Sequence, residues 1–157
     1  MVAAGPQRHT IPGLRLVHLP VRPAWLGVIL LGGTAGTAGR AWLESSFAPV
    51  AGQWPWTTFW INLGGAFLLG ALLEALAISG PDHGWRRGLR LGLGTGLLGG
   101  FTTYSTFAVE SLGLIGSAAW LIGLGYALGS VLLGVAAAFA GVRAVRLPVR
   151  WYRRGRR

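Results

Sequence analysis

The chain has 157 residues, of which 52% are hydrophobic and only 11% are charged. A soluble domain usually carries about 25% charged residues, so the composition favours a membrane protein. It contains no cysteine, which excludes disulfides, thiolate metal sites and cysteine nucleophiles. All 14 basic residues are arginines that lie at the two ends and between apolar segments, which favours contact with lipid headgroups over a nucleic-acid-binding face, and no nucleic-acid partner is expected.

Residues 1–23 contain three arginines and four prolines and predict a basic N-terminal arm, loose or folded as a short surface helix. The apolar segment 24–43 approaches the roughly 20 residues of a membrane span and has no cleavage-like end, which favours a first span over a signal peptide. Within it, Gly32 and Gly36 allow another helix to approach closely. Arg40 lies near its end, and two interpretations stay open: snorkelling to the interface, or a buried pair or anion-attracting charge.

A second span is predicted over 56–78, after a short loop and beside tryptophans typical of a membrane interface. Thr58 and Asn62 are one helical turn apart and share a face. An Asn at this depth is costly unless it is hydrogen-bonded, so it either belongs to a polar site or joins two helices. Glu74 is expected to reach the interface at the far end.

The third predicted span, 88–110, has glycine at every fourth position from Gly88 to Gly100, which predicts a groove for a neighbouring helix. Its second half, Gly99–Phe107, reads GGFTTYSTF and is too rich in hydroxyls for a lipid-facing helix. Such a run is typical of a helix that breaks inside the membrane and offers its backbone to an ion. Tyr104 and Phe107 are three residues apart, so their rings are expected to point the same way.

The fourth predicted span, 118–142, carries Tyr126 and Ser130 on one face. This pair either joins two helices by a hydrogen bond or continues a polar track that includes Asn62. Residues 143–157 form a polybasic C-terminal tail that is typical of an anionic-lipid contact.

The arginines also predict an orientation. The N-terminal arm, the 79–90 loop and the tail hold three, three and seven of them, which is 13 of the 14, and the fourteenth is Arg40. Four spans place these three segments on one side, so the positive-inside rule predicts a multi-pass protein of the cytoplasmic membrane with both termini in the cytoplasm.

Four motifs in order identify a family resemblance. They are GGTAGTAGR ending at Arg40, T-x-x-x-N-x-x-G-x-F-x-x-G over Thr58–Gly70, GGFTTYSTF over Gly99–Phe107, and Tyr126 with Ser130. In this respect the chain resembles the CrcB/Fluc fluoride channels over residues 24–142.

The resemblance implies an all-α membrane fold with four transmembrane helices per subunit and the third helix broken. Two subunits would pack antiparallel around two pores that export fluoride passively. It also implies a structural sodium ion held by the backbone carbonyls of Gly99 and Thr102, and it matches Glu110 to the family's acidic residue after the break. The residues it places along the fluoride path are Thr58, Asn62, Tyr104, Ser105, Thr106, Phe107, Tyr126 and Ser130.

Two features depart from the family pattern. Tyr104 stands where the family usually has Phe, which adds a hydroxyl. The arginine bias is stronger than expected for a subunit that inserts in both orientations. The chain is therefore expected to insert in one orientation and to pair with an oppositely oriented homologue, with a homodimer as the other possibility.

Three other classes of protein fit the sequence less well. A small four-helix multidrug-type transporter needs a carboxylate deep in its first helix, and here no acidic residue precedes Glu44. A second alternative is that the chain is a non-conducting partner subunit of a heteromeric fluoride channel. An enzyme is not expected, because all three histidines lie outside the predicted spans and no nucleophile–base pair is visible.

Overall fold

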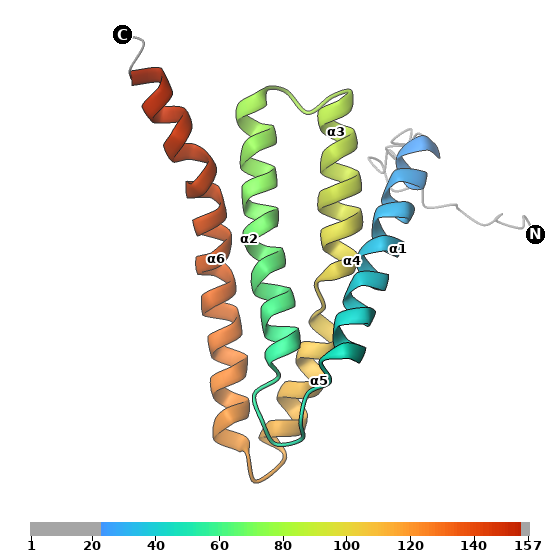
Figure 1. The fold of residues 1–157 in the computed structure, drawn as a ribbon, viewed down its shortest axis with the longest axis vertical. Coiled ribbons are helices and arrows are strands. Elements are labelled where there is room, and N and C mark those ends of the chain that lie inside the picture. Colours follow the sequence, from blue (N-terminus) through green and yellow to red (C-terminus); the bar gives the residue numbers. More distant parts are fainter. Residues whose placement is uncertain (1–22, 155–157) are drawn as a thin grey trace, which may run out of the picture.

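The computed structural model describes residues 23–154, so most of the predicted N-terminal arm and residues 155–157 lie outside the described residues. Within this range every regular element is helical: α1 (Pro23–Ser46), α2 (Trp56–Ser79), α3 (Trp85–Leu89), η1 (Arg90–Leu98), α4 (Gly99–Phe101), α5 (Tyr104–Ile115) and α6 (Trp120–Arg154). The start of α1, the α2–α3 loop and the end of α6 all lie at the same end of the molecule (Figure 1).

Among the residues that the structure describes, two helices are long and apolar enough to cross a membrane, namely α2 and the Trp120–Leu147 part of α6. The arrangement with four spans stays a prediction. Helix α6 has 35 residues, which at 1.5 Å per residue makes it about 52 Å long, more than the roughly 30 Å hydrocarbon core of a bilayer. Its backbone continues from the predicted fourth span into the predicted basic tail without interruption.

Glycines let α1 pack backbone against backbone on η1 and α4. A Cβ added at Gly96 would lie 2.8 Å from the carbonyl oxygen of Ile29, and one added at Gly100 would lie 2.5 Å from that of Gly33. The predicted glycine groove is therefore confirmed, and α1 occupies it. Segment η1 is a π-helix, a wider coil than the regular helix the glycine spacing indicates, and such coils often occur at functional sites.

The other side of the molecule is held by larger side chains. Helix α6 packs against α2 and α5, and Phe59, Leu114 and Tyr126 form the buried core between them. The expectation that Glu74 reaches the membrane interface stays a prediction, but the side chain does not stand free. Its side chain is buried and pairs with Arg146 through both carboxylate oxygens, at 2.6 Å to Nε and 3.0 Å to one terminal nitrogen. Burial of a carboxylate requires such a partner.

A helix break separates α4 from α5. The backbone is extended at Thr102 (φ −77°, ψ 154°) and Thr103 (φ −141°, ψ 125°), and the helix restarts at Tyr104. This interruption lies inside the hydroxyl-rich run where the sequence predicts it (Figure 1). Its depth in a bilayer stays a prediction.

Candidate functional site

Asn62 of α2 is hydrogen-bonded to the broken backbone. Its amide nitrogen donates to the carbonyl oxygen of Thr103 at 2.9 Å, and its amide oxygen accepts from the N–H of Thr103 at 2.8 Å. The two bonds replace partners that Thr103 would have in a continuous helix. Asn62 therefore joins two helices, as one of the two interpretations expects, and the cleft described below shows that it also lines a polar site.

The hydroxyls after the break cap the new helix. Thr103 Oγ1 accepts from the N–H of Thr106 at 3.1 Å, which is the N-cap bond of α5. The hydroxyl oxygens of Thr106 and Ser105 lie 3.1 Å and 3.3 Å from the same Oγ1 atom. Ser105 and Thr106, expected along the fluoride path, thus belong to a capping cluster around Thr103. Sequence reasoning did not single out Thr103, although a Thr before an apolar helical run is an N-cap signal.

An open cleft of about 290 Å³ lies beside the break. The rings of Tyr104 and Phe107 line it with their centroids 6.1 Å apart, which confirms that they lie on the same side. Tyr104 is 80% exposed within this single chain. The lining consists of Asn62, Thr102, Thr103, Tyr104, Phe107, Ser130 and Val131.

Ser130 contributes a hydroxyl without a partner to this cleft. Its Oγ atom is buried, and no other atom of the described residues is within hydrogen-bond reach. A buried hydroxyl left unpaired costs free energy, and such an exception points to a group that binds there. Ser130 therefore lines the cleft and carries an uncommitted hydroxyl, whose Oγ atom is itself buried in this conformation.

Below the cleft, Glu110 collects two hydroxyls. Thr58 donates to one carboxylate oxygen at 2.8 Å, and Tyr126 donates to the other at 2.8 Å. Thr58 and Tyr126 are essentially inaccessible, at 1% and 0% exposure. The two hydroxyls expected along the fluoride path are thus bound to Glu110. The ring centroid of Phe107 is 5.3 Å from that of Tyr126, so the cleft and the Glu110 cluster are adjacent.

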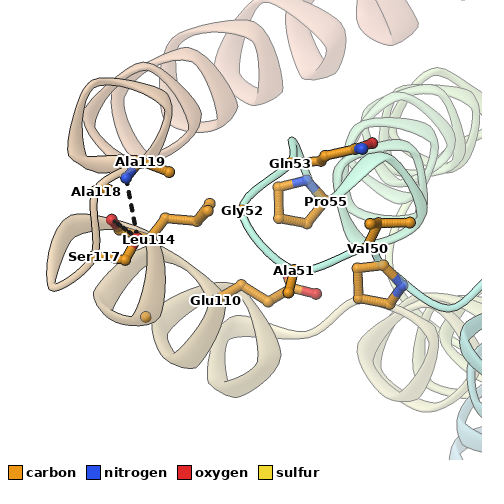
Figure 2. A pocket seen from close by; sticks show the side chains of 12 residues that line it. Val50, Ala51, Gly52, Gln53, Pro55, Glu110, Leu114, Ser117, Ala118 and Ala119 are labelled. Atoms are coloured by element: carbon orange, nitrogen blue, oxygen red, sulfur yellow. Dashed lines mark hydrogen bonds between the residues drawn. The ribbon is translucent and has the colours of Figure 1, made fainter.

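Glu110 also reaches a second, larger cavity of about 620 Å³. Figure 2 shows this cavity between the α1–α2 loop, where Gln53 and Pro55 lie, and the turn from α5 to α6. Trp54 of the same loop packs edge-on against Tyr126, with ring centroids 5.5 Å apart. A continuous path therefore runs from the helix break to the end of the molecule that carries this loop. It passes the cleft, Phe107, Tyr126, Glu110 and the larger cavity in turn.

The carbonyl side of the break faces α1. In a continuous helix the N–H of Thr103 would donate to the carbonyl of Gly99. Here it donates to Asn62 instead, so the Gly99 carbonyl lacks this donor. The next carbonyl, that of Gly100, accepts from Thr37 Oγ1 at 3.4 Å and from Arg40 Nε at 3.3 Å. Carbonyl oxygens are the ligands that alkali cations take in ion channels. The carbonyl of Gly99, which lacks the helical donor Thr103 N, and the carbonyl of the extended residue Thr102 are therefore candidate cation ligands.

Arg40 forms an ion pair rather than standing alone at an interface. Its terminal nitrogen lies 3.1 Å from a carboxylate oxygen of Glu44, and the two side chains are 22% and 25% exposed. The structure shows a pair of the kind that one interpretation expects, and the position of Arg40 relative to the membrane interface stays a prediction.

Comparison with known proteins gives one consistent result. The family model described as "CrcB-like protein, Camphor Resistance (CrcB)" matches residues 27–142. The fluoride-specific ion channel FluC 1 of Cutibacterium acnes is 46% identical over 85% of this chain and 93% of its own length. FluC 2 of Leifsonia xyli subsp. xyli is 50% identical over 80% and 85%, and FluC of Oceanobacillus iheyensis is 43% identical over 74% and 87%.

Proposed function

The chain belongs to the CrcB-like protein family, and from that membership we propose that it is a fluoride-specific ion channel. The observation that carries the proposal is the cleft at the helix break, which holds an uncommitted hydroxyl on Ser130 beside Asn62 and two aromatic rings. A channel moves its ion without converting it chemically, so the protein is not an enzyme. Flux from the cytoplasm outward is passive in this proposal, driven by the fluoride gradient.

Fluoride is small and strongly hydrated, so the cleft has to replace its water with other donors. Asn62 has two amide N–H groups, and its bond to Thr103 uses one, which leaves the second for an anion. Ser130 adds a hydroxyl, and the ring edges of Tyr104 and Phe107 are electropositive. The cleft also lies at the N-terminal end of α5, where the helix dipole favours negative charge.

Beyond the cleft, fluoride meets hydroxyls that are already committed. Thr58 and Tyr126 both donate to Glu110. We propose that the anion passes by exchange, in which one hydroxyl leaves the carboxylate and donates to fluoride for the duration of the passage. Several modest sites of this kind suit conduction better than one tight site. The cavity at the α1–α2 loop is then one mouth of the path.

A structural sodium ion is the second part of the proposal. The carbonyls of Gly99 and Thr102 would hold it, and its positive charge would stabilise the anion path at close range. Replacing sodium with a larger cation on both sides of the membrane is expected to slow fluoride flux. A fluoride flux that does not depend on the cation would contradict the proposed sodium site.

Assembly and orientation form the third part. We propose an antiparallel dimer in the cell membrane, with both termini of this chain in the cytoplasm and an oppositely oriented homologue as partner. In support, the start of α1, the α2–α3 loop and the end of α6 share one end of the molecule, and Arg86, Arg87 and Arg143 lie in the segments nearest that end. Topology reporters at both termini are expected to show one orientation. Equal amounts of both orientations would contradict this part alone.

The function itself is tested in cells. A bacterium that lacks its own fluoride exporter is expected to grow in millimolar fluoride when it expresses this chain, together with an oppositely biased homologue if the chain is silent alone. The Asn62→Asp variant, expressed at the same level, is the control and is expected not to restore growth. Equal growth of both strains would contradict the assignment of the path.

A further inference from the structure

Arg40 sits beside the carbonyls of the helix break. Its Nε donates to the carbonyl of Gly100 at 3.3 Å, and a different nitrogen of the same guanidinium pairs with Glu44. Gly100 immediately follows Gly99, whose carbonyl is a proposed sodium ligand. A permanent positive charge therefore stands close to the place where the cation would bind.

An unpaired guanidinium in this place would repel a cation. Arginine stays protonated under all ordinary conditions, so neighbouring groups have to offset its charge. Glu44 does so from the next turn of α1, with both carboxylate oxygens within 3.4 Å of the same Arg40 nitrogen. The partial burial of both side chains reduces solvent screening between them.

The position of Glu44 is unfavourable for the helix itself. Glu44 lies in the last turn of α1, where the helix dipole disfavours an acid. The order Arg40 then Glu44 is also the weaker order for an i, i+4 pair. Stability of α1 therefore gives little reason for an acidic residue here, whereas the charge of Arg40 gives one.

We propose that Glu44 is a positioning residue for the sodium ion: it neutralises Arg40, so that the guanidinium can hold the Gly100 carbonyl without repelling a cation at Gly99 and Thr102. This inference rests on the proposed sodium site. It assigns the Arg40–Glu44 pair to the cation side of the break.

The test compares Glu44→Gln with Asp82→Asn in the full-length protein. Both variants remove one carboxylate that pairs with an arginine, but Asp82 pairs with Arg90 in the α2–α3 loop region, away from the break. The readout is the thermal midpoint of the purified protein as sodium is raised at constant ionic strength, because a bound ion stabilises the folded state. The sodium dependence of fluoride efflux is the second readout.

For Glu44→Gln, the sodium concentration that gives half of the stabilisation is expected to rise about tenfold. A rise of this order is what the repulsion from one uncompensated charge near a partly buried cation would cause. Asp82→Asn and the charge-preserving Glu44→Asp are expected to stay within about twofold of the wild type. A Glu44→Gln protein with the sodium dependence of the wild type would overturn the inference while leaving the channel and its sodium site intact. A wild-type protein that does not respond to sodium would overturn both the sodium site and this inference.

A double variant keeps the test decisive if Glu44→Gln folds poorly. Arg40→Gln/Glu44→Gln removes both charges, so its sodium dependence is expected to stay within about threefold of the wild type. A tenfold loss in the double variant would show that the pair acts through structure and not through charge, which would contradict the inference.

Discussion

The helical segments on the two sides of the break are built from different residues and make different contacts. The segment before it, η1 with α4, is rich in glycine and lies against the backbone of α1. The segment after it, α5, begins with hydroxyl and aromatic residues and packs against α6. The first therefore ends in backbone carbonyls, and the second begins with N–H groups, hydroxyls and ring edges.

This difference would allow one short stretch to serve two ions of opposite charge, as we propose for sodium and fluoride. A helix C-terminus has carbonyl oxygens without partners, and a helix N-terminus has N–H groups without partners. The break places both beside each other, and Asn62 holds them in register through its two bonds to Thr103. In our account, cation chemistry belongs to the first segment and anion chemistry to the second.

The largest expected effect is on the anion side, at Asn62. Asn62→Asp places a negative charge in the cleft and removes the donor to Thr103. A fixed negative charge about 4 Å from a passing anion repels it by roughly 4 kcal/mol at an effective dielectric constant of about 20, so fluoride efflux is expected to fall at least about 100-fold. Efflux from liposomes measures it, with size-exclusion chromatography to show that the variant is folded. Wild-type efflux from this variant would remove Asn62 from the path.

The next effect concerns the hydroxyls on Glu110. Thr58→Val keeps the shape of the side chain and removes one donor to the carboxylate, and fluoride efflux is expected to fall about tenfold, because a hydrogen bond to a charged group contributes about 1.5–3 kcal/mol. Thr57→Val is the matched control, since Thr57 donates to the loop carbonyl of Phe47 and is expected to change efflux less than twofold. An equal loss in both variants would point to folding and not to the path.

On the cation side, the expected effect is on stability. Gly36→Ala puts a methyl group against the backbone around Leu97 and 2.9 Å from the nitrogen of Phe101, whereas a Cβ at Gly27 in the same helix meets nothing within 4 Å. Overpacking of this kind costs about 1–3 kcal/mol. The thermal midpoint is therefore expected to fall for Gly36→Ala and not for Gly27→Ala. Equal thermal midpoints for the two variants would contradict this account, because close backbone packing against α1 would then not stabilise η1 and α4.

The smallest expected effect concerns the extra hydroxyl of Tyr104. Tyr104→Phe keeps the ring edge beside Phe107, so fluoride efflux is expected to stay within about threefold of the wild type. Tyr104→Ala removes the edge and is expected to lower efflux further. A large gain in the Phe variant would show instead that the hydroxyl obstructs the path.

The sequence predicts the break better than the contacts around it. The cluster of glycines and hydroxyls over Gly99–Phe107 is a local signal, and the spacing of Tyr104 and Phe107 determines which side they share. The wider coil of η1 has no such local signal, because it depends on how closely the backbone of α1 approaches.

Contacts between distant residues could not be predicted in the same way. Thr58 and Glu110 are 52 residues apart, and Glu74 and Arg146 are 72 apart. Which hydroxyl meets which carboxylate depends on the rotation of each helix about its axis, and in a glycine-rich chain many rotations are sterically possible. For this reason the sequence places Thr58 and Tyr126 along the expected fluoride path but does not predict that both hydroxyls donate to Glu110.

The most direct test of the central claim is fluoride efflux from liposomes that contain the purified chain, with chloride as the reference ion and with an oppositely biased homologue added if the chain is silent alone. The account predicts fast efflux of fluoride, little efflux of chloride, and slower efflux when a larger cation replaces sodium. Absence of fluoride efflux in both preparations, or chloride efflux at the same rate, would contradict it.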